Sequence, residues 1–255
     1  MNSEWIWRRQ RRALGYDEEL RRGNVPLSNA SNMSAGRLYR ILDFYRVVQI
    51  FEKKELFFAH PSLWDDPYEQ RVQHQSSHAL FAQCWCRLGI SDAMWRIYSP
   101  NHMGVRISTT TKRLDNAVRA SAKNLGYGWV SQEVEYISQL ELNLRARKIA
   151  AGLEKEFNLA DAVKVLFLKR EAFAHEAEWR ATIYCPDEDR SKPSNGVGIK
   201  INPHELIDSI LLDPRAPQEL VDAFTYYFKH KLKFKGRVER SVLYRSPRRI
   251  EVVDR

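Results

Sequence analysis

The sequence predicts a single α+β domain of basic character. Segments typical of strands and of helices follow one another in irregular order, and no internal repeat or low-complexity linker divides them. A chain of 255 residues can bury one sizeable core, and 44% hydrophobic with 29% charged residues is ordinary for a globular protein. We expect a basic N-terminal helix and loop over residues 1–36, then one domain over residues 37–255 that ends in a basic tail.

The elements of the first half are predicted from alternation, capping residues and turn residues. Strands are expected at residues 37–42, 55–60, 78–86, 104–109 and 129–137. Helices are expected at residues 43–54, 91–98 and 111–125, with Asp43 and Ser91 as N-caps and Gly126 ending the third. The polar stretch 62–75 is expected to be loop or a short turn of helix.

The elements of the second half follow from the same signals. Helical periodicity runs over residues 139–168 in two pieces, split around 157–160. A strand is expected at 176–185, and a polar loop at 186–195. Short strands at 196–201 and 206–212, a helix at 217–232 and an extended basic tail at 234–253 complete the chain.

The formal net charge of +9 is concentrated near the C-terminus. Between residues 229 and 249 one acid, Glu239, stands against a run of cations: Lys229, Lys231, Lys233, Lys235, Arg237, Arg240, Arg245, Arg248 and Arg249. Clustered cations attract polyanions, so nucleic acid is an expected partner, although a solvated basic face has the same pattern. No helix-turn-helix, zinc-finger or RNA-recognition signature accompanies the charge.

The cysteines and the absent motifs narrow the chemistry. Cys84, Cys86 and Cys185 form no C-x-x-C pair, so we expect reduced thiols, a cytoplasmic location and no metal. No apolar run reaches the roughly 20 residues of a membrane-spanning helix, and no membrane contact is expected. The sequence has no phosphate-binding P-loop, G-x-G-x-x-G, H-E-x-x-H or G-x-S-x-G motif. P-loop ATP hydrolysis, Rossmann-type hydride transfer and zinc hydrolysis are therefore disfavoured.

Two segments hold aromatic and polar candidates for a ligand site. Between residues 57 and 69 a strand ends at a proline, and acidic groups crowd a turn beside Trp64 and Tyr68. These groups either bind a ligand or only cap the turn, as Asp and Asn commonly do. Trp95 and Tyr98 lie three apart on a predicted helix, where they either stack on a base or nicotinamide ring or belong to the core.

A third segment carries the acidic candidates. Glu176, Glu178 and Arg180 alternate along a predicted strand and are expected to share one face. Two carboxylates beside a guanidinium can hold a ribose hydroxyl or stabilise positive charge that develops in glycosidic cleavage. The alternative is a surface charge ladder in which Arg180 neutralises its neighbours.

With these residues the sequence resembles the family catalogued as domain of unknown function 2971, which is similar to abortive phage-resistance proteins of the AbiGi kind. The resemblance spans residues 38–212. It rests on Leu38-Tyr39-Arg40, on residues 58–69, on Met94-Trp95 with Tyr98 and Gly104-Val105, and on Lys169 with Glu176-x-Glu178-x-Arg180. Asp65 stands where Asn is usual, and Cys84-Trp85-Cys86 where C-F-S is usual. The family name itself implies no activity.

The order of the elements is also distantly similar to the ADP-ribosyltransferase fold, although the chain lacks a clean serine-threonine-serine middle motif. The likeness implies a split mixed and antiparallel β core with flanking helices. It implies Glu178 as the catalytic residue and Glu176 as the second member of an E-x-E pair. The residues expected to bind NAD are Tyr39, Arg40, His60, Ser62, Trp64, Asp66, Tyr68, Trp95, Tyr98 and Arg180.

The leading hypothesis is therefore an NAD-dependent ADP-ribosyltransferase-like enzyme, a toxin of a bacterial or phage conflict or antiviral defence system with an antitoxin or defence partner. Nucleic acid is the expected acceptor, held by Lys229, Lys231, Lys233, Lys235, Arg237, Arg248 and Arg249. One alternative is a non-catalytic nucleic-acid-binding regulator or sensor. Another is a metal-dependent nuclease with Asp65, Asp66, Glu176 and Glu178 on one divalent ion. The leading hypothesis requires the acidic pair to share a pocket with Tyr39 and Arg40.

Overall fold

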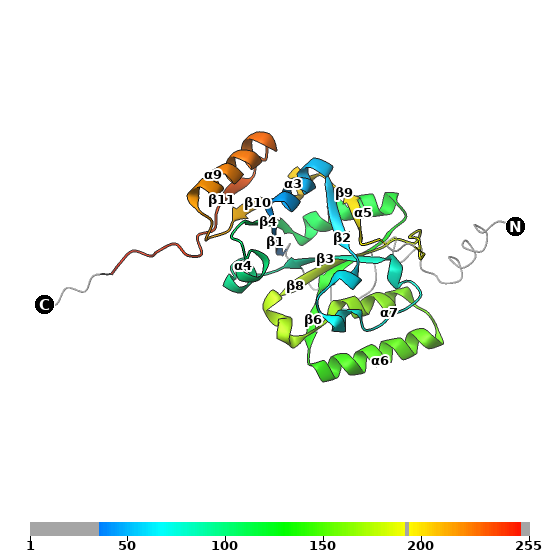
Figure 1. The fold of residues 1–255 in the computed structure, drawn as a ribbon. Helices are drawn as coiled ribbons and strands as arrows, with labels where there is room; N and C mark the ends of the chain where they lie inside the picture. The colour runs from blue at the N-terminus through cyan, green and yellow to red at the C-terminus, as the bar shows by residue number, and fades with distance from the viewer. Residues whose placement is uncertain (1–35, 192–193, 251–255) are drawn as a thin grey trace.

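Strand β3 (Leu80–Cys86) lies at the centre of the sheet in the computed structural model, which describes residues 36–191 and 194–250 (Figure 1). Six of its seven residues are buried, as expected for a continuous apolar run. One edge of β3 pairs antiparallel along its whole length with β8 (Glu178–Tyr184), and β8 pairs with β5 (Gly128–Glu133). The strand that carries Glu178 is thereby fixed on both sides.

The other edge of β3 is shared by two strands that each meet it at one residue pair. β1 (Arg37–Asp43) meets it at Tyr39 and Cys86, and β2 (Glu55–Ala59) meets it at Ala59 and Ala82. Because both strands leave the same edge at different points, the sheet forks here. β1 continues to β4 (Gly104–Thr110), β10 (Ser209–Leu212) and β11 (Arg237–Arg240), and β2 continues to β9 (Gly196–Lys200).

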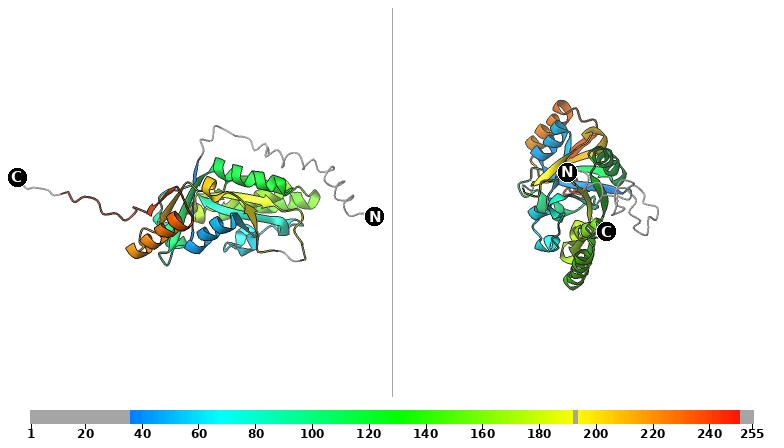
Figure 2. Two further views of the ribbon diagram at one scale, coloured as in Figure 1. Left: turned by 90° about the horizontal axis from the view of Figure 1, so that it is seen from above. Right: turned by 90° about the vertical axis from the view of Figure 1, so that its right-hand side faces the viewer.

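The fold is a single α+β domain, as predicted. Its nine-stranded sheet is mixed, since β10 and β11 pair parallel while the other pairs in that sheet are antiparallel. Helices flank it: α3 (Phe44–Lys53), α4 (Asp92–Tyr98), α5 (Thr111–Asn124), α6 (Gln139–Lys155), α7 (Leu159–Lys164), α8 (Pro203–Leu206) and α9 (Gln218–Tyr226). Seen from above, α3 and α5 lie on either side of the strands (Figure 2).

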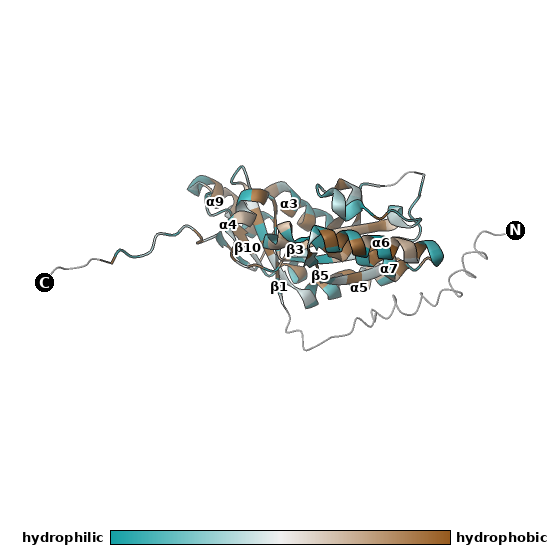
Figure 3. Cartoon of the chain, turned by 90° about the horizontal axis from the view of Figure 1, so that it is seen from below, coloured by the Kyte–Doolittle hydropathy of each residue, from teal (hydrophilic) through white to brown (hydrophobic). Residues whose placement is uncertain are grey.

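A smaller unit adjoins β5 and β8. β6 (Glu135–Ile137) and β7 (Leu168–Arg170) form a two-stranded parallel sheet, and α6 packs on β7 and α7. Leu140 and Leu144 of α6 are 71% and 53% exposed, and the helix shows apolar as well as polar residues (Figure 3). Leu80 of the main sheet and Val163, Leu166 and Phe167 form a buried cluster that joins the two parts.

Capping and turn chemistry place several boundaries where the sequence predicts them. The Ser91 hydroxyl accepts a hydrogen bond from the Met94 amide at the start of α4. Gly126, which follows the end of α5, has a φ of +72°, a conformation that glycine adopts without strain. Asp43 occupies the N-cap position of α3, but its side chain makes no capping hydrogen bond.

Three predicted elements are divided in the structure. The strand expected at 129–137 is two strands separated by Val134, whose amide donates to the Glu178 carbonyl. The stretch 206–212 holds the end of α8 and then β10, because Asn202 caps a helical turn at Pro203. The helix expected at 217–232 ends at Tyr226 and continues as a π-helical turn, Tyr227–Lys231.

The basic tail is less regular than predicted. β11 is its one strand within the described residues, and residues 241–250 form neither helix nor strand. Lys229 and Lys231 lie in the π-helical turn, so the cations do not alternate along one edge strand. Residues 1–35, where the basic N-terminal helix is predicted, and residues 251–255 lie outside the described residues. No helix in the described part of the chain has both the length and the apolar character needed to cross a membrane.

Candidate active site

A pocket opens where β1 diverges from β3, and we call it the fork pocket. Its lining comes from β1, β3, β4, α4 and the start of β8. The lining residues are Tyr39, Arg40, Ile41, Leu42, Cys84, Trp85, Cys86, Leu88, Ser91, Met94, Trp95, Tyr98, Arg106, Glu176 and Glu178. The structure thus brings the acidic pair and the Tyr39-Arg40 strand to one cavity, which is the arrangement that the leading hypothesis requires.

Glu176 reaches this pocket by a different route from the one predicted. It ends a 3₁₀ helix, Glu171–Glu176, and β8 begins only at Glu178. Between them Ala177 has a φ of 41°, in the left-handed region, and this turn reverses the chain. The expected alternation of three residues along one strand is therefore wrong for Glu176. It holds for Glu178 and Arg180, which lie two apart on β8.

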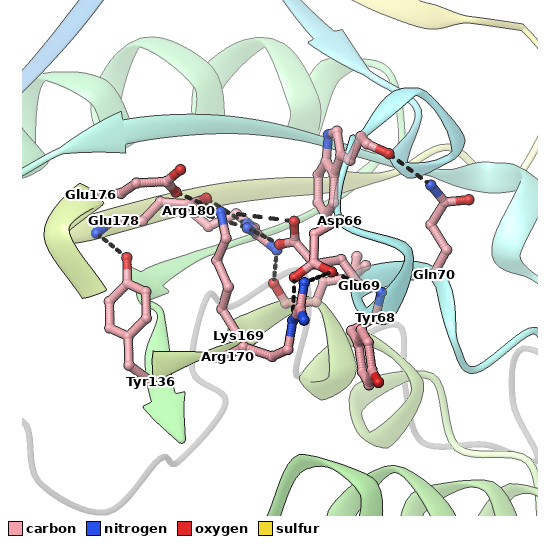
Figure 4. A network of polar contacts seen from close by, with 12 residues as sticks. Asp66, Tyr68, Glu69, Gln70, Tyr136, Lys169, Arg170, Glu176, Glu178 and Arg180 are labelled. Carbon is pink, nitrogen blue, oxygen red and sulfur yellow. Dashed lines mark hydrogen bonds and ion pairs between the residues drawn. The ribbon is translucent and has the colours of Figure 1, made fainter. Parts of the chain in front are cut away.

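Lys169 joins the two glutamates (Figure 4). Its Nζ lies 2.5 Å from Glu176 Oε2, 3.3 Å from Glu178 Oε2 and 3.8 Å from Glu69 Oε2. The Lys169 side chain is buried, as are those of Glu69 and Glu178. Desolvation by burial favours the neutral form of a lysine, so it acts to lower the pKa of Lys169. The surrounding carboxylates outweigh this effect and raise the pKa, which keeps the ammonium group protonated.

Arg180 completes the ion cluster. Its Nε and Nη2 donate to the two oxygens of Glu178 at 2.6 and 2.8 Å, and Nη2 also donates to Glu69 at 2.5 Å. Nη1 donates to the Leu166 carbonyl, and the Trp64 ring lies 4.2 Å from the guanidinium carbon. Arg180 is 0% exposed and does not line the fork pocket. From the sequence we expect Arg180 to contact a ligand, but in the structure its guanidinium binds Glu178 and Glu69.

The cluster keeps Glu178 ionised. Burial alone would raise its pKa, but Arg180 and Lys169, with a hydrogen bond from the Cys84 thiol, outweigh burial and hold the pKa at about 2. Glu69 behaves differently, because desolvation dominates there and raises its pKa. With every group charged, the three carboxylates of Glu69, Glu176 and Glu178 exceed the two cations by one negative charge. Of these carboxylates Glu176 and Glu178 line the fork pocket, so a ligand there meets two acidic side chains.

The lining of the fork pocket also holds two arginines, Arg40 and Arg106. Among the residues that the structure describes, the Arg40 guanidinium has neither a hydrogen-bond nor an ion-pair partner. Arg106 lies with its guanidinium carbon 4.6 Å from the Tyr39 ring and donates from Nη1 to the Gly89 carbonyl, while its buried Nε has no partner among those residues. Desolvation lowers the pKa of both arginines. A half-buried guanidinium without a partner, that of Arg40, and an unsatisfied Nε on Arg106 lie beside one cavity, and an anionic ligand would satisfy both.

Aromatic side chains line the wall formed by α4 and β1. Trp95 is 1% exposed, whereas Tyr98 is 43% exposed and its hydroxyl donates to Glu176 Oε1 at 3.5 Å. Both line the fork pocket together with Tyr39. The sequence leaves two interpretations of Trp95, either a core residue or part of a ligand site. The structure agrees with both, because Trp95 is buried and also lines the cavity.

The residues expected from the segment 57–69 lie elsewhere: His60, Ser62, Trp64, Asp66 and Tyr68 do not line the fork pocket. Nδ1 of His60 is 2.7 Å from the Ser62 hydroxyl. Asp66 caps the Tyr68 amide and binds Arg170 at 2.9 Å, so the turn-capping interpretation applies to it. Tyr68 stacks on the Arg170 guanidinium at 4.3 Å. Two residues of this segment contact Arg180: Glu69 accepts a hydrogen bond from its guanidinium, and the Trp64 ring packs against it.

Several site residues were not singled out as candidates from the sequence. Glu69 and Lys169 lie in the blocks that carry the family resemblance, but nothing in their spacing reveals that they meet. The Tyr136 hydroxyl, which accepts a hydrogen bond from the Glu178 amide at 2.8 Å, comes from the separate small sheet. Cys84 and Cys86 alternate on β3, which is the one local signal that both face the same side.

The C-terminal cations remain largely solvent-facing. Lys229 is partly buried and donates to the Gly236 carbonyl at 2.5 Å, and Arg237 pairs with Glu239 at 3.1 Å. Phe234, between the lysines, is buried and fixes this turn to the core. The exposed cations are Lys231, Lys233, Lys235, Arg237, Arg240, Arg245, Arg248 and Arg249.

Comparison with known proteins bears on this site. Residues 94–181 match a family model described as protein of unknown function, DUF2971. The resemblance to this family is confirmed over these residues, a shorter span than the expected 38–212. The matched segment includes residues 94–98 of α4, Lys169, Glu176 and Glu178. No curated protein matches the chain.

Solved structures of DarT from Thermus sp. 2.9 are similar to this chain at low identity. The complex with NAD⁺ shares 11% identity at a TM-score of 0.38 and covers 83% of this chain and 98% of that chain. The complex with carba-NAD⁺ shares 12% identity at 0.38 and covers 82% and 97%. The complex with ADP-ribosylated ssDNA shares 11% identity at 0.40 and covers 84% and 98%.

Proposed function

We propose that the chain is an ADP-ribosyltransferase-like enzyme with NAD⁺ as its substrate. One observation carries the proposal: the ionised carboxylate of Glu178 and the unpartnered guanidinium of Arg40 line one pocket, whose lining also includes Tyr39, Trp95 and Tyr98. A dinucleotide with a cationic ring, ribose hydroxyls and a pyrophosphate needs these three kinds of group.

Each wall of the fork pocket has a role in binding this substrate. Arg40, supported by Arg106, pairs with the pyrophosphate, because a half-buried guanidinium and a phosphate satisfy each other by charge-assisted hydrogen bonds. Tyr98, which is 43% exposed, offers its ring to the nicotinamide, and the buried Trp95 lines the pocket beside it. The carboxylate wall holds the adjoining ribose through its hydroxyls.

The reaction that this arrangement supports is cleavage of the bond between the ribose anomeric carbon and the nicotinamide nitrogen. Nicotinamide leaves with the bonding electron pair, and the anomeric carbon develops positive charge. Glu178 stabilises that charge because it is already ionised and its orientation is fixed by Arg180, Lys169 and Tyr136. An acceptor then donates an electron pair to the anomeric carbon and loses a proton. Glu176, the more accessible carboxylate, is the group placed to assist the acceptor.

The acceptor class is nucleic acid in this proposal. A polyanion-attracting surface on the same domain as the fork pocket is supplied by Lys231, Lys233, Lys235, Arg237, Arg245, Arg248 and Arg249. A toxin or antiviral defence role, with an antitoxin partner and a cytoplasmic setting for the free thiols of Cys84, Cys86 and Cys185, belongs to the same proposal.

The decisive experiment is incubation of the full chain with NAD⁺ and a mixture of DNA, RNA and protein, followed by mass spectrometry. The proposal expects free nicotinamide and one acceptor carrying ADP-ribose. If nicotinamide is released but no acceptor is modified, NAD⁺ cleavage stays part of the proposal and the nucleic-acid acceptor is ruled out. If NAD⁺ is not consumed, the proposal that the chain is an NAD⁺-cleaving enzyme is wrong.

A non-catalytic nucleic-acid binder is the second candidate, favoured by the exposed cations alone. It expects salt-dependent binding of DNA or RNA with NAD⁺ left intact. The metal-nuclease alternative needs carboxylates that are free to bind an ion, and three of its four, Asp66, Glu176 and Glu178, are paired with cations. Asp66 pairs with Arg170, and the two glutamates pair with Lys169.

A further inference from the structure

Helix α4 forms one wall of the fork pocket, and it is short. Its seven residues, Asp92–Tyr98, present Met94, Trp95 and Tyr98 to the cavity. A helix of two turns is marginal by itself, so its position depends on contacts with the rest of the fold. Whatever holds α4 therefore sets the shape of the pocket.

The C-terminal end of α4 is held by a residue from the loop that follows β10. Arg215 Nη2 donates to the Trp95 carbonyl at 3.0 Å and to the Ser99 carbonyl at 2.9 Å. The Trp95 carbonyl also accepts from the Ser99 amide at 3.0 Å, and the Ser99 carbonyl also accepts from the His102 amide at 3.2 Å. Arg215 is therefore a second donor to each carbonyl, at the end of the helix where the dipole favours a cation. Arg215 itself does not line the fork pocket.

Asp213 fixes the direction of this arginine. Its side chain is 0% exposed, and its carboxylate accepts from Arg215 Nη2 at 2.9 Å, from Nε at 3.1 Å and from the Arg215 amide at 2.7 Å. Asp213 thus holds the Nε and Nη2 side of the guanidinium, and Nη2 shares its two hydrogens among Asp213 and the two carbonyls of the α4 end. Burial acts to raise the Asp213 pKa, but the hydrogen bonds from Arg215 and Ser99 keep it lowered, so the pair stays charged.

The same junction joins α4 to the start of β4. The Gly104 amide donates to the Ser99 hydroxyl at 2.9 Å, and the Asp213 amide donates to the Gly104 carbonyl at 3.1 Å. A Cβ on Gly104 would lie 2.5 Å from Ser99 Cβ, so the two segments touch without room for a side chain. Three segments far apart in the sequence therefore meet at the end of α4.

A contrasting contact lies at the other end of the helix. The Tyr244 hydroxyl donates to Asp92, and Arg96 donates to that hydroxyl at 3.4 Å. The side chains of Asp92 and Arg96 are 46% and 62% exposed. Water competes for such contacts, and they contribute little to stability. The C-terminal contact, with its buried carboxylate, is the stronger of the two.

We infer that Arg215 is a positioning residue for the fork pocket: by binding both carbonyls at the end of α4, it sets where Trp95 and Tyr98 stand. The inference rests on the proposed function only in taking NAD⁺ as the ligand. It would hold for any ligand that contacts the α4 wall.

The test compares Arg215→Met with Arg240→Met in the full chain. Arg240 is a matched control, because it donates to the Ala216 carbonyl of the same loop at 3.2 Å without reaching α4. Since Arg215→Met leaves Asp213 buried without its cation, Asp213→Asn with Arg215→Met serves as a second variant. The readouts are hydrogen exchange of the amides in residues 92–99 and steady-state nicotinamide release.

The inference expects faster exchange in residues 92–99, with β3 and β8 unchanged, and a KM for NAD⁺ raised about 10-fold at nearly constant kcat. A decrease in folded protein alone would lower kcat and leave KM unchanged, which would overturn the positioning role. The positioning role would also be wrong if the amides of α4 exchanged at the same rate in Arg215→Met as in Arg240→Met. If the wild-type chain does not consume NAD⁺, the proposed function fails, and exchange in residues 92–99 still decides the inference.

Discussion

Arg180 grips both carboxylate oxygens of Glu178, its neighbour two residues earlier on β8, with hydrogen bonds of 2.6 and 2.8 Å. This bidentate pair is buried, and a second carboxylate, Glu69, shares the same guanidinium. The pair fixes the orientation of Glu178 and keeps it charged at the edge of the fork pocket. Removing one partner from such a pair is more damaging than its net contribution to stability suggests.

Glu178→Gln tests the catalytic assignment. Glutamine keeps the shape but cannot supply the negative charge, so we expect nicotinamide release to fall at least about 100-fold. The change also leaves Arg180 and Lys169 with one anion fewer, and we expect the free energy of unfolding to fall by about 3 kcal/mol. Activity is therefore measured well below the melting temperature. Glu171→Gln, an exposed change in the same 3₁₀ helix, is the control and retains activity.

The acid dependence of stability follows from the pKa of Glu178, about 2 in the folded chain against an ordinary 4.5. A lowered carboxyl pKa stabilises the fold above pH 4.5, and this contribution disappears as the pH falls toward 2. The difference corresponds to about 3 kcal/mol. Glu69 acts in the opposite sense, since burial raises its pKa and its ionisation disfavours folding. Urea unfolding at a series of pH values measures the sum.

Comparison with Glu178→Gln separates the two glutamates. Without Glu178 the fall in stability below pH 4.5 becomes shallower, because the group with the lowered pKa is gone. An equally steep fall in the variant would show that Glu178 is not the group responsible.

The sequence predicts much of the fold because its signals are local. Alternation, the Ser91 cap and the turn at Gly126 are each settled by a few neighbouring residues. The fork of the sheet has no local signal, since it depends on β1 and β2 sharing one edge of β3. That arrangement was expected from resemblance and not from pattern.

The site was predictable in part for the same reason. Glu178 stands out by its place on a strand, and Trp95 by its helix. Lys169 and Glu69 become visible only when segments about a hundred residues apart along the chain meet at Arg180. The position of Arg180 behind Glu178, outside the lining of the fork pocket, was not predictable, because spacing shows which face a side chain takes but not how deeply it is buried.

Arg40→Met tests the anion-binding wall. Arg40 has no partner among the described residues, so its removal leaves no buried group unpaired, and stability should stay equal or rise slightly. The affinity for NAD⁺ should fall by about 10- to 100-fold, because the pyrophosphate loses a desolvated cation. Calorimetric titration measures the affinity. Arg46→Met, an exposed arginine on the neighbouring helix, is the control, and an equal decrease in both variants would contradict a specific role for Arg40.

The C-terminal cations provide the last prediction, which concerns the acceptor. Arg245, Arg248 and Arg249 are exposed, and removing a cation that binds a phosphate should reduce the salt dependence of nucleic-acid binding by about one unit of slope. The triple alanine variant should therefore bind single-stranded DNA or RNA more weakly, with a shallower slope of log Kd against log salt. NAD⁺ cleavage without an acceptor should not change, because these residues lie outside the fork pocket.

Control for this variant comes from α6, on another part of the domain. Alanine at Arg147, Lys148 and Lys155 removes the same charge from an exposed helix face (Figure 1). If long-range attraction to the whole basic chain drove binding, both triple variants would bind equally weakly. Weaker binding confined to the C-terminal variant would instead place the acceptor on the tail, since only interactions at short range distinguish two sets of cations of equal charge.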